Sequence, residues 1–537
     1  MNRSMGGRMF SPEREDYRAW HLTGRGFENL RAVRLPRPEI GPDELLLHQR
    51  VATICYSSIK VLMLGEGHPR LVGRDLAGEP VVLGDECYGV LAQVGDDLCG
   101  RFSVGEHVAV SPDLDVDAYG YGVPGALQQL NVIRGKMLDF LLKVPPEAVA
   151  KYGMFAMPLS EPLGCVERAL ALGYRAGPAP DGKMFIWADA RADRFRMGKL
   201  EHPPSRVLVY EPDGPVKVVR KELARRNISM AEVSDPAVVS GPFEDVLVVS
   251  SRPDVICGAV EWATPHLARF GVLALLGRPD AGCRISVDLG RTHYDRTRVV
   301  GSDSADVADA FTRNTAFGLV AGSSVLLMGA GGPMGQFFLM RALAERDAKP
   351  SRVLAAEILP TRVENLRRML SRIDTDIDVS VLDVSAEPTR HAPEVTGIDH
   401  LVLLCADIGA LEKWLGALND NAVVNAFAGL KGAMLSIDAA DVCSRGVRVI
   451  GHSGVNLDFQ QRTLAKIISG EVNVAPVVAA VGGFDAIGRA LEASRDGTYP
   501  GKIAVYLDTD GPLTPVASMT DGAPWSAEAE RAFLTRT

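Results

Sequence analysis

The stretch VLLMGAGGPMGQ, Val325–Gln336, is an apolar run followed by a glycine-rich turn and the start of a helical segment. A strand, a tight glycine turn and a helix in this order are typical of the unit that binds the pyrophosphate of a dinucleotide. Glycine is needed because the turn is tight and because the phosphates approach backbone N–H groups closely. The residues predicted to hold the cofactor here are Gly329, Gly331, Gly332, Pro333, Met334 and Gly335.

The first glycine of the usual G-x-G-x-x-G spacing is displaced in this turn, which weakens the interpretation. An acidic residue further along the chain supports it. Glu357 ends the next predicted strand, 22 residues after Gly335. A carboxylate at that position accepts hydrogen bonds from the ribose hydroxyls of the adenosine. Because it repels a 2′-phosphate, NAD is favoured over NADP, although Arg362 leaves NADP open. The alternative is a glycine-rich turn beside a solvated glutamate.

Apolar strands alternate with helical stretches from about residue 181 onward, which predicts parallel sheets of the doubly wound type. The pattern occurs twice, and matching segments follow one another in the same order. They are SRVLVYEP from Ser205 with SRVLAAEI from Ser351, FEDVLVV from Phe243 with IDHLVLL from Ile398, and RVVGSDSADV from Arg298 with RVIGHSGVNL from Arg448. The offsets are 146, 155 and 150 positions. A duplication explains them, and chance likeness among generic strand–helix units is the alternative.

The first copy lacks the glycine turn. Its equivalent stretch reads WADARADRF, which places Arg191 and Arg194 opposite Gly332 and Gly335. Arginine there would block both the approach of a phosphate and the packing of the helix on the strand. We therefore expect no dinucleotide to bind this copy in the usual way. Glu211, opposite Glu357, is interpreted as a remnant, and the arginines either bind another anion or are solvated.

Composition narrows the class of protein. The chain has 537 residues and 57.6 kDa, which predicts several domains. Lys and Arg number 58 against 67 Asp and Glu, a net charge of −9, so no basic surface for nucleic acid is indicated. No apolar run is long enough for a membrane span or resembles a signal peptide. Eight scattered cysteines favour reduced thiols in a cytoplasmic protein.

Residues from about 30 to 175 are predicted to be rich in β-structure, with short β-prone runs between glycine, proline and aspartate. The runs are Leu45–Leu47, His48–Ile54, Tyr88–Val94 and Glu106–Val110. The stretch from Ser160 to Leu172 is predicted to be a helix that Ser160 caps.

This order of features resembles the medium-chain dehydrogenase/reductase family, the zinc-type alcohol and polyol dehydrogenases. Its members have a GroES-like β-rich catalytic domain, a Rossmann domain and a return segment. The resemblance covers about 30–175 and 318–507, and in detail it is closest to the branch typified by L-sorbose 1-phosphate reductase. The matching stretches are ICYSSIK (Ile54–Lys60), LGDECYGVLAQVG (Leu83–Gly95), SEPLGCVERA from Ser160, GGPMG (Gly331–Gly335) and GEVNVAPVVAAVGGFDAIGRALEASRDGTYPGKIAV (Gly470–Val505).

The resemblance implies a catalytic metal held by Cys55, Asp85, Glu86 and Glu161. Asp85 departs from the family pattern, which has histidine at this position. Zinc accepts thiolate, imidazole and carboxylate ligands, so Zn²⁺ or another divalent ion is expected. A thiolate with carboxylates makes a harder site and a weaker Lewis acid. The alternative is a vestigial site, in which Cys55 is a small buried hydrophobe and Glu161 caps its own helix.

The same comparison assigns catalytic roles to Ser57, Lys60 and Glu86. Ser57 would relay the proton of the substrate hydroxyl, and Lys60 would help bind an anionic substrate. His68, thirteen residues after Cys55, either approaches the metal or a substrate phosphate or is solvated. Because 95–130 contain only Cys99, the four clustered cysteines of the family's structural zinc are absent.

The expected fold is α/β, with a GroES-like catalytic domain and two tandem Rossmann-type doubly wound domains, the first of them degenerate. The predicted bounds are 1–180 for the catalytic domain, completed by about 471–507, then 181–317, 318–470 and a loosely packed C-terminal tail at 508–537. Subunits of the family commonly pair through the edge strands of their Rossmann domains. The degenerate copy could supply that edge, so the chain is either a monomeric pseudo-dimer or a homodimer.

The predicted function is metal-dependent, NAD-linked interconversion of a secondary alcohol and its ketone on a polyol or sugar, including a sugar phosphate. Two alternatives stay open. One is a non-redox, NAD-binding pseudoenzyme or scaffold with a decayed metal site. The other is an enzyme that uses tightly bound NAD to oxidise a sugar transiently. No nucleic-acid or membrane partner is expected.

Overall fold

The computed structural model describes residues 15–112, 118–171, 175–198, 202–312, 318–385 and 395–536. The chain forms two compact units. The first comprises 1–167, 332–344 and 454–537, and the second comprises 168–331 and 345–453. Among the residues described, no helix is both long enough and apolar enough to cross a bilayer.

The first unit is built on a mainly antiparallel sheet that joins distant parts of the chain. Its strand order is β25-β23-β24-β3-β5-β6-β8, with β7 also paired to β3. The bounds are β3 (Leu45–Thr53), β5 (Cys87–Val94), β6 (His107–Val110), β7 (Leu130–Ile133), β8 (Leu141–Lys143), β23 (Val478–Gly483), β24 (Lys502–Tyr506) and β25 (Thr514–Pro515). β24 runs antiparallel to β3, with Ala504 opposite Thr53. A segment near the end of the sequence therefore completes the N-terminal sheet.

A smaller sheet and several helices complete this unit. The sheet has the order β2-β1-β4, with bounds β1 (Asp16–Leu22), β2 (Leu30–Pro36) and β4 (Val81–Val82). The helices are α1 (Tyr56–Leu64), α2 (Pro146–Tyr152), α3 (Ser160–Ala171, of which 160–167 belong here), α8 (Pro333–Leu343), α12 (Leu457–Ser469), α13 (Ile487–Asp496), α14 (Val516–Met519) and α15 (Ala527–Arg536). Alternate side chains of β3, β5 and β24 form the core, among them Leu47, Ala52, Leu91, Ile503 and Val505.

The C-terminal segment corrects one expectation, because it is firmly packed rather than loose. Trp525 is fully buried, and Phe533 of α15 contacts it edge-on at 6.2 Å between ring centroids. The Glu530 carboxylate, 3% exposed, accepts hydrogen bonds from the backbone N–H groups of Met154 (2.7 Å) and Phe155 (2.9 Å) and from the Tyr506 hydroxyl (2.8 Å). The polar composition of the tail concealed these buried anchors.

The free energy of unfolding should fall as the pH rises, because of the titration of Glu530. Burial raises the pKa of this carboxyl from 4.5 to about 7, so between these values the folded chain holds a proton that the unfolded chain has lost. Glu530→Gln removes this titration. As the pH rises from 5 to 8, the unfolding free energy of the variant minus that of the wild type should therefore increase by about 2–3 kcal/mol.

Urea unfolding at the two pH values measures this difference. Glu528→Gln, an exposed change on the same helix, is the control and should show no pH-dependent difference. Parallel pH dependences of Glu530→Gln and the wild type would contradict the assignment.

In the described part of the second unit, twelve strands form one sheet in the order β11-β10-β9-β12-β13-β15-β22-β20-β19-β16-β17-β18. The first six are β9 (Lys183–Ala188), β10 (Arg206–Tyr210), β11 (Met230–Val233), β12 (Phe243–Val249), β13 (Leu267–Leu276) and β15 (Arg298–Ser302). The other six are β16 (Ser324–Met328), β17 (Arg352–Glu357), β18 (Asp378–Asp383), β19 (Ile398–Leu403), β20 (Leu418–Ala426) and β22 (Arg448–Gly451). Numbered along the chain, each set has the order 3-2-1-4-5-6, which is the Rossmann arrangement.

The helices that connect these strands also repeat. Those of the first copy are α4 (Lys217–Arg225), α5 (Pro253–His266), α6 (Leu289–Tyr294) and α7 (Val307–Thr312). Those of the second copy within this unit are α9 (Pro360–Leu370), α10 (Ile408–Trp414) and α11 (Ala439–Cys443). One apolar core runs through both copies, from Phe185 and Val246 of the first to Leu401 and Val424 of the second.

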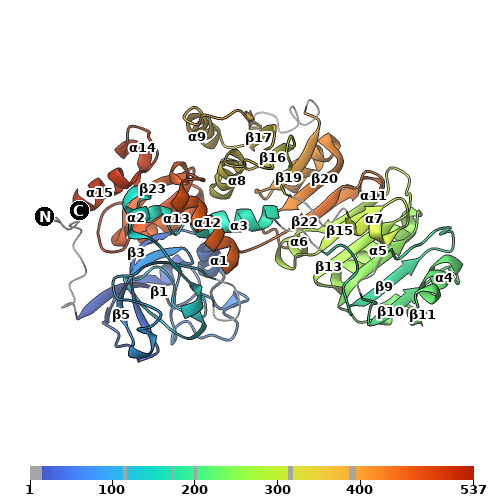
Figure 1. The fold of residues 1–537 in the computed structure, drawn as a ribbon, viewed down its shortest axis with the longest axis horizontal. Coiled ribbons are helices and arrows are strands. Elements are labelled where there is room, and N and C mark those ends of the chain that lie inside the picture. The colour runs from blue at the N-terminus through green and yellow to red at the C-terminus, as the bar shows by residue number, and fades with distance from the viewer. Residues whose placement is uncertain are drawn as a thin grey trace. The chain divides into compact units, whose positions relative to one another are not determined.

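The two copies meet through equivalent residues. β15 and β22 are the antiparallel neighbours in an otherwise parallel sheet, and Val299 pairs with Val449, exactly its counterpart 150 positions later. A short ribbon of β14 (Arg284–Asp288) and β21 (Met434–Asp438) is centred on Ser286 and Ser436, also 150 positions apart. Pairing of a residue with its own equivalent marks a two-fold axis. The predicted pairing of the two edge strands is therefore confirmed (Figure 1).

We expect the chain to be a monomer of 57.6 kDa in solution. The edge strand that a single Rossmann copy would expose is covered here by the other copy, which removes the usual template for pairing with a second chain. Light scattering coupled to size exclusion, over a dilution series, measures the mass. A stable mass of twice this value would contradict the expectation.

Candidate active site

Three residues predicted as metal ligands come together in the first unit. Cys55 lies between β3 and α1, and Asp85 and Glu86 directly precede β5. Antiparallel pairing of β3 with β5 brings these ends together, since Ala52 lies opposite Cys87. One ligand atom each from Cys55, Asp85 and Glu86 lies within 4.8 Å of the other two. This is the close grouping that a metal ion requires.

A lysine that the sequence analysis did not identify faces this cluster. Lys502, the first residue of β24, is buried and donates from Nζ to Glu86 Oε1 and to the Ile54 carbonyl (3.3 Å). Glu86 is fully buried, and its Oε2 accepts a hydrogen bond from the Thr53 hydroxyl. Both oxygens of Glu86 therefore have protein partners. The sequence signal was a lysine preceding the apolar run Ile503–Val505.

The fourth predicted ligand, Glu161, lies close but outside that trio. It is the second residue of α3, and its Oε1 accepts a hydrogen bond from Cys165 Sγ at 3.3 Å. Burial raises the pKa of Glu161 well above its usual value, and Glu86 and Asp85 raise it further. Glu161 therefore shares the electrostatic environment of the cluster, although the structure does not place its carboxylate within the group of three.

The whole cluster disfavours negative charge. Burial is the largest cause that raises the pKa of Cys55, Asp85, Glu86 and Glu161, and their mutual repulsion adds to it. Lys502 opposes this effect, and the carboxylates raise the pKa of its ammonium in turn despite burial. One lysine cannot balance four buried acidic groups. A bound divalent cation would remove both the desolvation cost and the repulsion.

Asp85 shows that the residues fit such a cation. Its Oδ2 accepts a hydrogen bond from Ser57 Oγ at 2.6 Å, whereas its buried Oδ1 has no hydrogen-bond partner among the residues described. An unpartnered buried carboxylate oxygen is costly. With Cys55 Sγ and a carboxylate oxygen of Glu86 nearby, the donor set is one that zinc accepts.

The predicted catalytic residues lie around the cluster. Ser57 contacts Asp85 as described, and burial followed by the Asp85 carboxylate raises the pKa of buried Tyr121, a residue that was not predicted from the sequence. Glu86 belongs to the cluster itself. Lys60 is half-buried on α1 and close enough to His68 to lower the pKa of that imidazole, after the larger effects of burial and Arg70. Ser57 and Glu86 therefore lie in the site, and Lys60 lies on the side toward His68.

In the second unit, the predicted cofactor residues adopt the expected tight turn. Gly329 follows β16 with φ +88°, a conformation that favours glycine. A Cβ on Gly331 would lie 2.6 Å from Arg362 Cβ and 2.8 Å from Glu357 Oε2, so only glycine fits there. Glu357 is buried, and its Oε2 accepts from Gly331 N (2.9 Å) while Oε1 accepts from Ile358 N (2.8 Å). Ribose hydroxyls would have to share this carboxylate with the turn.

The rest of the predicted turn belongs to the first unit. Gly332 is the N-cap of α8, Pro333 occupies its first turn, and Gly335 and Gln336 are buried. Met334 is the second residue of this helix. Proline is suited to the first helical turn because its missing N–H would have no partner there. The N-terminus of α8 presents backbone N–H groups of the kind that bind phosphate.

At the equivalent edge of the first copy, the acidic side chains are bound by neighbouring residues of the same copy. Asp189, 1% exposed, accepts hydrogen bonds from Ser250 Oγ (3.0 Å) and Arg191 N (3.0 Å). Glu211 is engaged by Arg220 and by Val216 N (2.7 Å). The side chain of Arg194 is 67% exposed. These contacts favour the prediction that this copy binds no dinucleotide in the usual way.

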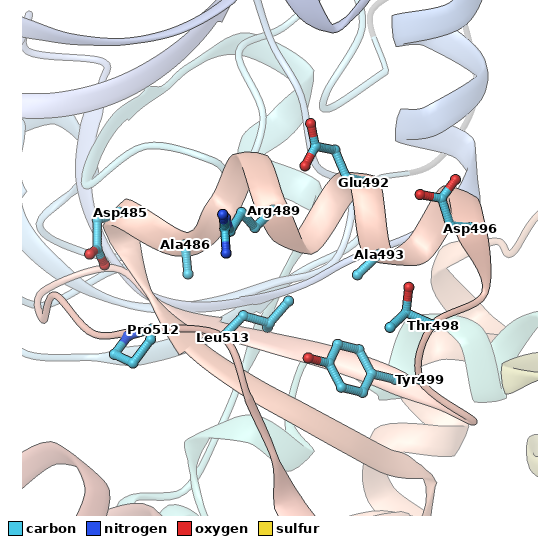
Figure 2. A pocket seen from close by; sticks show the side chains of 10 residues that line it. All are labelled: Asp485, Ala486, Arg489, Glu492, Ala493, Asp496, Thr498, Tyr499, Pro512 and Leu513. Carbon is cyan, nitrogen blue, oxygen red and sulfur yellow. The ribbon is translucent and has the colours of Figure 1, made fainter.

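A cavity of about 550 Å³ in the first unit contains none of the predicted site residues. The cavity lies along α13 and the turn after it, and Pro512 and Leu513 also line it (Figure 2). Its charged residues are three acids, Asp485, Glu492 and Asp496, and one base, Arg489. Because the chemistry-bearing groups are elsewhere, the acid cluster and not this cavity is the candidate active site.

Comparisons with known proteins agree with this geometry. Residues 41–146 match the alcohol dehydrogenase GroES-like domain. The uncharacterized protein YggP of Escherichia coli (strain K12) is 26% identical over 63% of this chain and 83% of its own length. Mannitol-1-phosphate 5-dehydrogenase of Aliivibrio fischeri is 23% identical over 51% of this chain and 71% of its own.

A solved structure shows the same fold. That of 2R,3R-butanediol dehydrogenase from Bacillus subtilis is similar with a TM-score of 0.52 and 12% identity, covering 91% of this chain and 99% of that one. The predicted fold class, a GroES-like domain with Rossmann-type parallel sheets, is confirmed. The matched domain and the named relatives support the medium-chain dehydrogenase/reductase family and an oxidoreductase of the alcohol and polyol dehydrogenase type, and the solved structure shows the shared fold.

Proposed function

We propose that this enzyme is metal-dependent and NAD-linked and that it interconverts a secondary alcohol of a polyol or sugar, sugar phosphates included, with the corresponding ketone. The observation that carries the proposal is the cluster of half-buried Cys55 with buried Asp85 and Glu86, whose ligand atoms lie within 4.8 Å of one another; among the residues described, Asp85 Oδ1 has no hydrogen-bond partner. The likeness to mannitol-1-phosphate 5-dehydrogenase supports a polyol-type substrate.

Cys55, Asp85 and Glu86 would hold the metal, with Glu161 beside them. When bound, a divalent ion supplies Lewis acidity that lowers the pKa of an alcohol oxygen. The protein's own contribution is to desolvate the site and to hold the substrate hydroxyl next to Ser57 Oγ. Lys502 keeps one negative charge of the cluster compensated throughout.

Ser57 is placed to move the alcohol proton. Its Oγ donates to Asp85 Oδ2 at 2.6 Å. In oxidation the substrate loses this proton from oxygen and a hydride from carbon, which leaves the ketone. NAD held at the turn of Gly329–Gly335 would supply the acceptor for this hydride, and Ser57 would carry away the hydroxyl proton.

NAD rather than NADP is proposed on the basis of Glu357. A buried carboxylate beside the Gly331 turn disfavours a 2′-phosphate by charge repulsion. The turn residues Gly329, Gly331, Gly332, Pro333, Met334 and Gly335 would hold the pyrophosphate. The side chain of Arg362 begins beside this turn, because its Cβ would lie 2.6 Å from a Cβ added to Gly331.

The test combines two measurements on the full chain. Metal content is determined after purification without added zinc, and the dissociation constants of NADH and NADPH are compared. We expect bound divalent metal, tighter binding of NADH, and NAD-dependent oxidation of at least one polyol or polyol phosphate. A chain that takes up neither metal nor NADH would refute the proposal. Binding of NADH without turnover on such a panel would favour a pseudoenzyme instead.

A further inference from the structure

A buried tyrosine connects the acid cluster to a basic turn. Gly120 packs against Gly84, next to Asp85 in the chain, and burial and the Asp85 carboxylate raise the pKa of the neighbouring Tyr121 hydroxyl. Two basic side chains cover its ring: Arg70 Cζ lies 4.6 Å from the ring centroid, and the His68 ring centroid lies 5.5 Å away. The basic groups therefore contact an aromatic side chain that lies near Asp85 of the acid cluster.

The basic turn is held in a defined position. Arg74 donates from NH1 to the carbonyl of Tyr121 (2.9 Å) and from Nε to the carbonyl of Glu79 (3.1 Å). The backbone N–H of Leu71 donates to the carbonyl of His68 at 2.8 Å. Arg74 is thus used to fix the turn, whereas Arg70 lies exposed on the ring of Tyr121.

Positive charge converges on His68 from two elements. Arg70, from the same turn, and Lys60, from α1, both lower the pKa of His68, after the larger effect of burial. The imidazole is therefore kept neutral near pH 7, where it can donate one hydrogen bond. The positive charge near His68 comes from the Arg70 guanidinium and the Lys60 ammonium.

We propose that Lys60, His68 and Arg70 form a subsite for the phosphate of a phosphorylated polyol or sugar. This inference rests on the proposed function, because it assigns a substrate class to the same site. A phosphate dianion matches two cations and one neutral donor, and arginine binds phosphate oxygens bidentately. Arg70 and His68 contact the ring of Tyr121, whose hydroxyl is close enough to Asp85 for that carboxylate to raise its pKa, after the larger effect of burial, so the phosphate would bind on the Tyr121 side of the acid cluster.

The principal measurement is the ratio of kcat/KM for polyol phosphates to kcat/KM for their unphosphorylated parents. Arg70→Ala should lower this ratio roughly 10- to 100-fold, as expected for loss of a charge-assisted hydrogen bond to phosphate. Arg70→Glu should lower it further, and Arg70→Lys should recover part of the loss. Arg101→Ala is the matched control, since Arg101 is also exposed over an aromatic ring, that of Phe102 at 4.9 Å.

A second measurement does not depend on turnover. Binding of inorganic phosphate to the full-length protein, followed by calorimetry, should weaken at least tenfold in Arg70→Ala and in His68→Ala. Acetate, as a singly charged anion, should bind more weakly than phosphate to the wild type.

The outcomes separate the two proposals. Phosphate binding that depends on Arg70, without turnover of any alcohol, would support the subsite and contradict the proposed function. Turnover of polyols with a ratio that Arg70→Glu leaves unchanged would support the function and overturn the subsite. Equal binding of phosphate to the wild type and both alanine variants would also overturn it.

Discussion

Cys55→Ala is expected to release the bound metal and to lower kcat/KM by roughly 10³-fold, because a metal Lewis acid contributes several kcal/mol to such a reaction. Cys55 is the one sulfur donor of the trio, and the remaining carboxylates would form a harder site with lower affinity for zinc. Metal content by mass spectrometry and kcat/KM on the same preparations measure the two effects.

The controls use other residues of the same types. Cys99→Ala removes an exposed thiol and should leave metal content and activity unchanged. Asp85→Asn keeps the shape of the side chain but removes its charge, and it should weaken metal binding at least tenfold. Asp85→His supplies the imidazole that the family pattern has and should slow the loss of zinc to a chelator. Full metal content and full activity in Cys55→Ala would contradict the assignment of the site.

Lys502→Met is expected to destabilise the metal-free chain by about 3–5 kcal/mol, the cost of leaving a buried charge without its partner. Lys502 and Glu86 side chains are only 4% and 0% exposed, so water cannot replace the lost ammonium. The pKa of Glu86, already raised by burial, should rise further in the variant. Because the folded variant then binds a proton more tightly than the unfolded chain, the destabilisation should increase from pH 5 to pH 8.

Urea unfolding in the presence of a chelator measures this effect without a contribution from metal. The double variant Lys502→Met/Glu86→Gln should recover much of the lost stability, because neither charge is then left unpaired. Arg495→Ala breaks an exposed pair with Asp496, 39% and 52% exposed, and should change stability by less than about 1 kcal/mol. A Lys502→Met variant as stable as the wild type would show that the ammonium does not neutralise Glu86.

Much of the fold could be predicted because it depends on local pattern. Alternating apolar strands and helices indicated two sets of parallel strands, which the structure joins into one sheet, and the likeness of RVIGHSGVNL from Arg448 to RVVGSDSADV from Arg298 pointed to equivalent edge strands. β14 and β21 were not predicted, because a five-residue ribbon is stabilised by its partner across the copies rather than by its own sequence. The packing of α15 was missed for a similar reason: Glu530 bonds to Met154 and Phe155, more than 370 residues earlier.

The sequence alone indicated the parallel strands and the duplication, because strand periodicity and repeated segments are local properties of the chain. Its resemblance to the medium-chain dehydrogenases implied that Cys55, Asp85, Glu86 and Glu161 are candidate metal ligands. Only the tertiary structure decided which groups meet. It brought Lys502 to the cluster, placed Arg70 and His68 against the ring of Tyr121, and left Glu161 beside the trio. The physical reason is that burial and pairing of charges depend on contacts between distant strands, here the pairing of β24 with β3.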